Sequence, residues 1–470
     1  MIREQLEMDD LIEQGRQLAR NSDRPVLVSQ VMPIPPLDPL SFFAAAGPKY
    51  GGTRVYWSTP DQEQILIGLG TAFKIESDRP NRFEEIAHRW SELGKQAIIC
   101  SDAMENIGTG PLLLGGFSFD AVVDDPLWRA YRPASFVLPQ ILYTKNNEQH
   151  FLTINYYLQP DDAHLTHEKY DAIYWGEQLI KLSQNEVQQE YRSPSFQLLA
   201  TADFDQWQER VGQAVQLIKN GPIEKVVLAR RVEGISQEPL KPEPILSKLI
   251  EKQTASYIFA IERGNQIFMG ASPEQLIKKK ESVLVSTCLA GSIARGETPE
   301  QDRALSQSLL ADQKNRLEHE YVVRMIKEAL ADQCAHLQVG DEPVILKTAQ
   351  IQHLYTPVTG VLKPDVSLLS LVEKLHPTPA LGGYPKEEAM QIIRHLEPFE
   401  RGWYAAPIGW IDHQNNGEFA VGIRSGLIKG HKAVLYAGCG IVAESDPFAE
   451  YEETNIKLKP MLSALGGHIQ

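Results

Sequence analysis

The sequence of 470 residues has few cysteines, no excess of positive charge and no long apolar segment. Its four cysteines are widely spaced, with no CxxC pair and no companion histidine pattern, which argues against a disulfide framework and a zinc site. A reducing compartment such as the cytoplasm fits this usage best. The formal net charge of −15 argues against a nucleic-acid partner and a membrane partner, because both need basic patches.

Several common active-site motifs are also missing. The chain has no GxxxxGK[ST] phosphate loop, no HExxH zinc motif and no GxSxG nucleophile elbow. No apolar run approaches the roughly 18 residues of a membrane-spanning helix. Residues 1–20 predict a charged amphipathic helix without the apolar core of a targeting signal. With 43% apolar and 23% charged residues, we expect a soluble, untargeted globular chain.

The first 180 residues alternate short apolar or β-branched runs with turn residues. This pattern predicts strands of a largely antiparallel sheet at 54–58, 65–70, 112–119, 134–144 and 151–158. Helical spacing of apolar residues predicts helices at 82–93 and 164–182. The polar stretch 183–195 follows neither period and is interpreted as a linker, which ends an N-terminal lobe of residues 1–195.

Strands mixed with helices continue from residue 200 to residue 465. Predicted helices lie at 203–221, 299–333, 367–375 and 386–396. Predicted strands lie at 225–232, 256–262, 266–272, 283–291, 419–428 and 433–442. Runs of strands with interspersed helices predict an α+β fold with antiparallel sheets rather than a doubly wound parallel sheet.

A stripe of charged residues near the C-terminus could carry chemistry. In SDPFAEYEETNIK, a helix would place Glu450, Glu453 and Lys457 on one face, because residues three and four apart are neighbours. Two carboxylates and an ammonium there could hold a metal or an anion. Spacing alone favours the ordinary alternative, a solvated helix face with a Glu-to-Lys pair four residues apart.

Three further residues could take part in catalysis. Lys225 begins an apolar strand, where an ammonium that loses hydration becomes a usable base; the alternative is a strand-edge lysine in solvent. Glu274 follows another apolar strand, where a partly buried carboxyl could stay protonated and act as an acid. The alternative for Glu274 is a first-turn glutamate at a helix N-terminus. Glu318 could face Glu453 and form an all-carboxylate Mg²⁺ site.

Eight segments in order resemble the chorismate-utilising enzyme family across residues 200–460: KVVLAR, GASPE, LAGS-x-x-RG, K-N-R-x-E-H, HPTPALGG, GIRSG, YAGCGIV and SDP-x-x-EYEET. The family includes isochorismate, salicylate, anthranilate and aminodeoxychorismate synthases. The resemblance implies an α+β fold with two lobes of antiparallel sheet packed as a sandwich and helices outside. Chorismate and Mg²⁺ would bind in a cleft between the sheets, within a catalytic region at 200–465.

The resemblance also implies roles for individual residues. Glu318 and Glu453 match the metal ligands, and Glu450 matches a nearby supporting carboxylate. Lys225 matches the general base that activates water, and Glu274 matches the acid that protonates the departing ring hydroxyl. Arg424 matches the guanidinium that grips a substrate carboxylate, for which a planar fork is suited. Other substrate-binding positions in the cleft are matched by Gly291, Ser292, His353, Ala380, Leu381, Tyr404, Gly438, Gly440 and Lys457.

Departures from the amination enzymes favour isochorismate synthase activity, in which water attacks ring C2 and the C4 hydroxyl leaves. Lys225 stands where anthranilate synthases generally carry glutamine. The segment TCLAGS at 287–292 replaces the PIKGT that is usual in aminodeoxychorismate synthases, and Ala380 replaces a threonine. Water is therefore the expected nucleophile, and no glutaminase partner is expected.

Two alternatives are kept open. The long N-terminal lobe resembles menaquinone-specific isochorismate synthases more than the shorter siderophore-pathway ones, but a siderophore role is not excluded. Salicylate synthase, which eliminates pyruvate from isochorismate in the same cleft, is poorly separated by sequence. A non-catalytic relative would lack part of the expected catalytic set, and no gap exists. On this interpretation Glu453 and Lys457 take separate roles, so the Glu-to-Lys pair is disfavoured.

Overall fold

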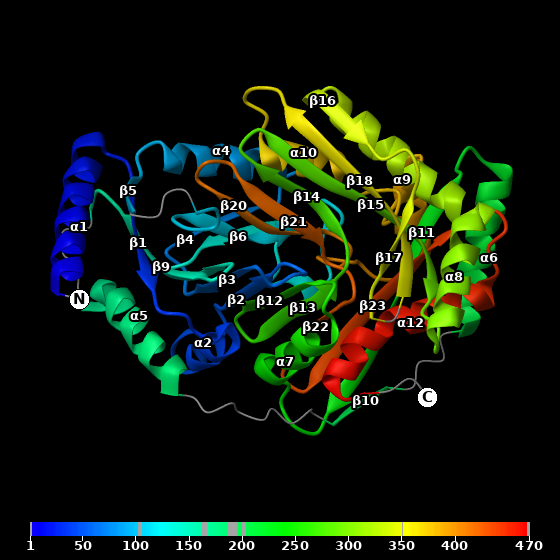
Figure 1. Cartoon of the computed structure of the whole chain (residues 1–470), viewed down its shortest axis with the longest axis horizontal. Coiled ribbons are helices and arrows are strands. Elements are labelled where there is room, and N and C mark those ends of the chain that lie inside the picture. The colour runs from blue at the N-terminus through cyan, green and yellow to red at the C-terminus, as the bar shows by residue number, and fades with distance from the viewer. Residues whose placement is uncertain are drawn as a thin grey trace.

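Two large sheets form the centre of the computed structural model, which describes residues 2–101, 106–161, 167–185, 195–199, 204–349 and 351–467. One sheet has thirteen strands and the other has ten among these residues. Nearly all neighbouring strands are antiparallel, although β1 and β5 run parallel. The α+β fold with two antiparallel-rich sheets and outer helices is therefore confirmed (Figure 1).

The larger sheet contains strands from both halves of the sequence. In spatial order its strands are β10 (Phe196–Leu198), β11 (Lys225–Ser236), β23 (Lys432–Ile441), β22 (Ser425–Lys429), β13 (Gln266–Ser272), β12 (Tyr257–Arg263), β2 (Val55–Ser58), β3 (Gln64–Leu69), β8 (Ile141–Asn146), β9 (Gln149–Leu158), β1 (Val26–Ile34) and β5 (Ile98–Ser101), with β19 (Gly383–Tyr384) beside β11. The smaller sheet contains β16 (Cys334–Val339), β18 (Ile351–Leu362), β15 (Val283–Ala294), β14 (Gln275–Lys280), β21 (Gly417–Val421), β20 (Pro407–Asp412), β6 (Leu112–Phe117), β7 (Ala134–Leu138) and β4 (Phe73–Ser77), with β17 (Val344–Lys347) beside β18.

The sequence boundary between residues 195 and 200 does not separate the sheets. In the larger sheet β2 is hydrogen-bonded to β12, and in the smaller sheet β6 is hydrogen-bonded to β20. Each of these pairs joins a strand from the first 195 residues to a strand from the second half. Of the predicted linker, residues 183–185 end a helix, and residues 186–194 lie outside the described residues.

Helices cover the outer faces of both sheets. On the larger sheet lie α1 (Ile2–Ser22), α2 (Pro39–Ala45), α5 (His167–Asn185), α6 (Phe204–Asn220), α7 (Pro242–Lys252), α11 (Lys386–Leu396) and α12 (Pro447–Leu465). On the smaller sheet lie α4 (Arg82–Gly94), α8 (Pro299–Ala311), α9 (Gln313–Ala331) and α10 (Leu368–Leu375), and the short α3 (Gly47–Tyr50) follows α2. Figure 1 shows α4 and α10 above the sheets and α2, α7 and α12 below them. None of the described helices combines the length and apolar composition that crossing a bilayer requires.

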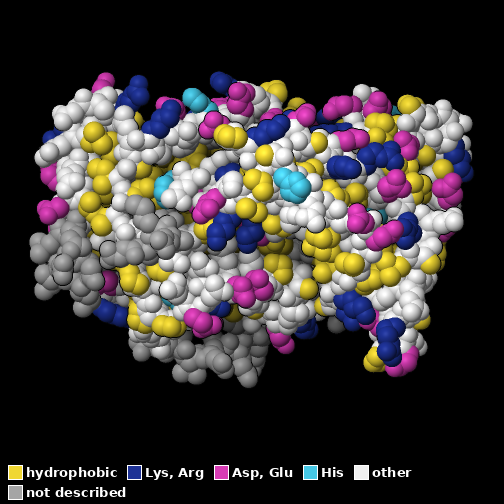
Figure 2. Space-filling model, turned by 45° about the horizontal axis from the view of Figure 1, so that its top comes forward, with side chains coloured by type: hydrophobic (Ala, Val, Ile, Leu, Met, Phe, Trp, Pro, Cys, Tyr) yellow, Lys and Arg dark blue, Asp and Glu magenta, His cyan; other side chains and the backbone are white. Residues whose placement is uncertain are grey.

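A single apolar core fills the space between the sheets. Trp57 and Phe259 of the larger sheet belong to the same buried cluster as Leu114 and Phe419 of the smaller sheet. A second buried cluster lies between the outer face of the larger sheet and its helices. On the face seen in Figure 2, lysines and arginines are interspersed with acidic side chains, so the described part of this face has no large basic patch.

Three predicted elements are each split in the structure. The strand predicted at 134–144 forms β7 in the smaller sheet and β8 in the larger sheet. The helix predicted at 299–333 forms α8 and α9, because Asp312 between them has extended backbone and its carboxylate caps α9. The strand predicted at 419–428 forms β21 and β22, which belong to different sheets. The chain turns between them at Arg424, whose φ of 51° breaks the extended conformation.

Candidate active site

Two neighbouring segments cross from one sheet to the other and carry side chains into the same space. β13 of the larger sheet continues through Pro273 and Glu274 into β14 of the smaller sheet. β21 of the smaller sheet continues through Arg424 into β22 of the larger sheet. The segments are hydrogen-bonded, because Val421 N donates to Glu274 O and Ala271 N donates to Arg424 O. Glu274 and Arg424 are therefore placed side by side by the main chain.

A cavity opens next to these crossings, with about 700 Å³ of space including open solvent at its mouth. All of the predicted site residues except Lys225 and Glu450 line it: Glu274, Gly291, Ser292, Glu318, His353, Ala380, Leu381, Tyr404, Arg424, Gly438, Gly440, Glu453 and Lys457. The structure thus brings together residues that lie far apart in the sequence.

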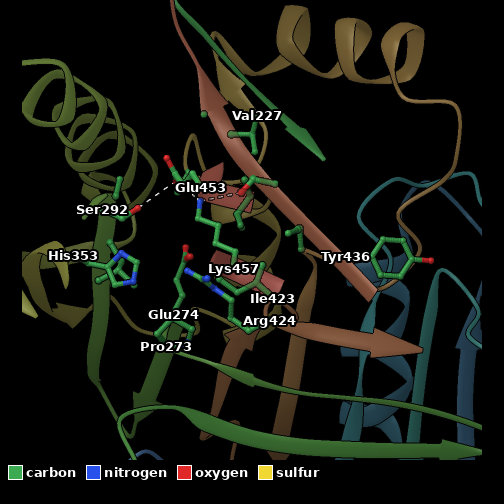
Figure 3. A pocket seen from close by; sticks show the side chains of 18 of the residues that line it. Val227, Pro273, Glu274, Ser292, His353, Ile423, Arg424, Tyr436, Glu453 and Lys457 are labelled. Carbon is green, nitrogen blue, oxygen red and sulfur yellow. Dashed lines mark hydrogen bonds and ion pairs between the residues drawn. The ribbon is translucent and has the colours of Figure 1, made fainter. Parts of the chain in front are cut away.

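Glu274 has the environment of a carboxylic acid that keeps its proton. It is 5% exposed, and burial raises the pKa of Glu274 to about 7 although Lys225, Lys457 and Arg424 act in the opposite direction. Figure 3 shows Glu274 with Arg424 and Lys457 around one space. The alternative of a first-turn helical glutamate is wrong, because the chain after Glu274 enters β14. Glu274 can therefore donate a proton near neutral pH.

Lys225 is buried beneath the cavity wall and is not one of its lining residues. Its side chain is 0% exposed, and Nζ lies 2.6 Å from Oε1 of Glu318, which does line the cavity. A solvent-exposed strand-edge lysine is therefore the wrong interpretation. Gly440 leaves room for this pair, because a Cβ there would lie 2.6 Å from Glu318 Oε1 and 2.7 Å from Lys225 Cε.

The glutamate and lysine stripe on α12 requires a correction. The disfavoured Glu-to-Lys pair does form, since Lys457 Nζ lies 2.6 Å from Glu453 Oε1 and also donates to Gly438 O at 2.9 Å. The helical spacing of four residues brings the two side chains together without displacing either from the cavity wall. Burial raises the pKa of Glu453, but Lys457, Lys314 and Arg424 outweigh burial and lower the pKa overall.

Arg424 and His353 offer polar groups to a ligand. Both are buried, and the described residues give the Arg424 guanidinium no hydrogen bond and no ion pair. Burial lowers the pKa of Arg424 to about 10, so its charge is kept at neutral pH. Burial, with the nearby charges of Arg424 and Lys457, holds the pKa of His353 well below its usual range. Nε2 of this neutral histidine has no hydrogen-bond partner among the described residues.

The carboxylates could contribute to a cation site but do not form a complete one. No group of three His, Cys, Asp or Glu side chains in the described part of the chain is arranged to hold a metal. Glu450 is buried behind the cavity and pairs with Lys314 at 2.8 Å. Burial lowers the pKa of Lys314, but Glu450, Glu318 and Glu453 outweigh burial and raise it. Three carboxylates thus interact electrostatically with Lys314. Two of them, those of Glu318 and Glu453, line the cavity and provide a donor set suited to Mg²⁺ that also binds water and a ligand carboxylate.

Nine cavity residues were not predicted from the sequence: Val227, Pro273, Leu289, Ala290, Arg401, Ala405, Ile423, Tyr436 and Ala437. Strand alternation could have identified two of them, because Tyr436 shares a face of β23 with Gly438 and Gly440, and Val227 shares a face of β11 with Lys225. Arg401 gave no such signal. Its guanidinium donates to Glu397, to Leu381 O at 2.8 Å and to Val227 O at 2.7 Å, contacts that depend on the tertiary fold.

Comparison with known proteins identifies the class to which this site belongs. Residues 12–466 match the family model described as "Chorismate binding enzyme". The chain therefore belongs to the chorismate-binding enzyme family, and the family resemblance of its motifs is confirmed.

Individual relatives span nearly the whole chain. The chain is 43% identical over 458 residues to "Isochorismate synthase MenF" of Bacillus subtilis, covering 96% of this chain and 95% of the relative. It is 35% identical over 456 residues to "Salicylate biosynthesis isochorismate synthase" of Pseudomonas aeruginosa, covering 96% and 93%. The solved structure of MenF, the menaquinone-specific isochorismate synthase from Escherichia coli, shares the fold with a TM-score of 0.76 at 24% identity, covering 97% and 99%.

Proposed function

We propose that this protein is an isochorismate synthase, an isomerase that converts chorismate into isochorismate. The observation that carries the proposal is the buried Glu274, which faces the cavity, has its pKa raised to about 7 by burial, and is close enough to Lys225 to feel its charge. Support comes from the relatives at 43% and 35% identity, both of which are named isochorismate synthases. The residues provide an acid, a base and a cation that can bind a carboxylate.

In the proposed reaction a water molecule attacks ring C2 while the C4 hydroxyl leaves. Lys225 takes a proton from the attacking water, and Glu274 gives its proton to the departing hydroxyl, which leaves as water. The ring double bonds shift between these carbons, so one water is added, one is lost and the net change is an isomerisation. Since the Lys225 ammonium contacts Glu318, the base role requires the amine to lose that contact and its proton.

Substrate carboxylates would be held by the cationic and polar groups of the wall. Arg424 has a guanidinium without a protein partner among the described residues, and it suits a carboxylate. Neutral His353 can donate or accept one hydrogen bond through Nε2. Mg²⁺ at Glu318 and Glu453 would supply a Lewis acid for the ring carboxylate. These residues would hold the substrate in one orientation above Glu274.

The proposal extends to pathway, partner and compartment. Similarity to MenF over 96% of the chain favours a role in menaquinone biosynthesis, while a siderophore or salicylate pathway is the alternative. With water as nucleophile the enzyme would need no glutaminase partner. The four cysteines are unpaired, which suits the reducing cytoplasm.

Product analysis tests the activity. Purified protein with chorismate and Mg²⁺ should accumulate isochorismate, whereas salicylate and pyruvate would instead identify a salicylate synthase. Replacing Lys225 with alanine should abolish turnover without unfolding the protein. The matched control is Lys219→Ala, which removes an exposed lysine from the last turn of α6. A fully active Lys225→Ala variant would remove the base from the mechanism.

Metal removal tests the Mg²⁺ site. Treatment with a chelator should stop turnover, and added Mg²⁺ should restore it. The variant Glu453→Gln should need at least tenfold more Mg²⁺ for half-maximal activity, because an amide is a weaker cation ligand than a carboxylate. Full activity in the chelated wild-type protein would show that the two carboxylates have no metal-binding role in the reaction.

A further inference from the structure

One stretch of the cavity wall is a bulge in strand β15. Gly291 is an extra residue there, because Ala290 pairs with Leu354 and Ser292 pairs with His353 on β18. Gly291 has a φ of 78°, a conformation that side-chain-bearing residues rarely adopt. Ala290, Gly291 and Ser292 all line the cavity. A bulge of this kind redirects side chains, so whatever holds it also sets what the cavity presents to a ligand.

Two residues of α9 hold this bulge. Ser292 N donates to Asn315 Oδ1 at 3.1 Å, and a Cβ on Gly291 would lie 3.2 Å from three atoms of Asn315. One helical turn further along, His319 Nδ1 lies 3.2 Å from Ala290 O. Nε2 of the same histidine lies 2.8 Å from the hydroxyl of Thr356 on β18. The bulge is therefore bound at both ends to the helix turn that carries Glu318.

The orientation of the Asn315 amide is itself fixed. Asp312 Oδ1 accepts hydrogen bonds from Asn315 N at 2.7 Å and from Asn315 Nδ2 at 2.9 Å. Because the amide nitrogen is turned toward Asp312, the amide oxygen faces Ser292. Asparagine suits this place, since it provides one donor and one acceptor, whereas aspartate would set a second carboxylate against Asp312.

The bulge also reaches the second helix of the site. Ser292 Oγ lies 3.4 Å from Glu453 Oε1 on α12, a contact drawn in Figure 3. A chain of contacts thus runs from Asp312 through Asn315 and Ser292 to Glu453. It connects the helix that carries Glu318 with the helix that carries Glu453, through the cavity wall between them.

We propose that Asn315 is a positioning residue that holds the Gly291–Ser292 bulge in place, so that the Ser292 hydroxyl faces Glu453 and the substrate. His319 supports the other end of the bulge. This inference rests on the proposed function for its kinetic readout. Misplacement of reacting groups by about 1 Å costs up to about a hundredfold in rate, so loss of this tie is measurable.

The kinetic test compares Asn315→Ala with Arg316→Ala. The first should lower kcat for isochorismate formation by ten- to a hundredfold with KM changed less than threefold. The matched control removes a neighbouring exposed side chain that pairs with Glu342 and should leave the rate unchanged. If Asn315 acts through Ser292, the double variant Asn315→Ala/Ser292→Ala should be no slower than the slower single variant. Full activity in Asn315→Ala, or multiplied losses in the double variant, would overturn the proposal.

Hydrogen exchange gives a readout that does not depend on activity. The amide of Ser292 should exchange at least tenfold faster in Asn315→Ala than in wild type, and at the wild-type rate in Arg316→Ala. Unchanged exchange would show that Asn315 does not hold the bulge. If the wild-type protein forms no isochorismate while exchange responds as expected, the proposed function fails and the tie from Asn315 to the bulge stands.

Discussion

At the residue scale, Glu274 shows how burial produces a reactive group. Its pKa of about 7 means that the protonated acid prevails below pH 7 and the carboxylate prevails above it. Since Glu274 must keep its proton while Lys225 must lose one, the rise of kcat with pH should stop as pH passes through 7, where Glu274 loses its proton. Steady-state rates between pH 6 and 9 measure this. The variant Glu274→Gln should have a low rate without that break near pH 7, and a wild-type rate that rises steadily to pH 9 would contradict the role.

Gly440 is a second residue whose importance depends on its surroundings. The substitution Gly440→Ala would push a methyl group against Glu318 and Lys225, so we expect kcat to fall about a hundredfold. The control is Gly212→Ala on α6, where an added methyl meets no atom within 4 Å and should stabilise the helix by about 0.5–1 kcal/mol. Parallel kinetics and thermal melts separate the two effects. Normal turnover in Gly440→Ala would show that the Lys225–Glu318 contact is dispensable.

At the element scale, the cap of α12 supports the helix that carries Glu453 and Lys457. The Asp446 carboxylate accepts a hydrogen bond from Ala449 N at 2.9 Å, and Pro447 occupies the first turn. Replacing Asp446 with alanine should lower the free energy of unfolding by about 1 kcal/mol. Denaturant titration measures the loss. The control Glu444→Ala removes an exposed carboxylate two residues earlier and should be neutral; an equal loss there would point to net charge rather than capping.

Elements with a clear period were predictable, and those with interrupted patterns were not. The helices α4, α10 and α11 lie within one residue of their predicted bounds because apolar residues recur at helical spacing. The twelve-residue strand β18 was missed because Pro357 and Gly360 interrupt it. The predictions also missed β1, β4, β5, β10, β14, β16, β17, β19 and β20. Strand periodicity carries no information on which sheet a strand joins, so the split at Arg424 was hidden.

The predicted site depended on ordered motifs rather than on local chemistry. Spacing on α12 favoured the Glu453–Lys457 pair, and the structure contains it. The position of Glu274 after an apolar strand suggested a partly buried acid, and the family resemblance placed it in the cleft, but the local sequence alone also allowed an exposed first-turn glutamate. Neither residue spacing nor the family motifs identified Arg401, because two of its hydrogen-bond acceptors, Leu381 O and Val227 O, come from segments that are distant in the sequence.

At the scale of the whole molecule, the two halves of the chain depend on each other. A fragment of residues 200–470 would leave β12 without β2 and β20 without β6, exposing two open sheet edges and half of the core. We expect this fragment to aggregate and to lack a cooperative thermal transition. Circular dichroism melts and size-exclusion chromatography provide the measurement, with the full chain as control. A monomeric fragment with a sharp transition would show that residue 200 begins an independent domain.

The paired crossings between the sheets have a mechanical consequence. β13 is hydrogen-bonded to β22 in one sheet, and β14 is hydrogen-bonded to β21 in the other. The two crossing segments therefore run side by side from one sheet to the other. If the sheets slide or the core between them is repacked, both crossing segments should shift together. The spacing between Glu274 and Arg424 is then kept by the backbone, so the proposed proton donor and the guanidinium proposed to bind a carboxylate remain aligned while the surrounding protein changes.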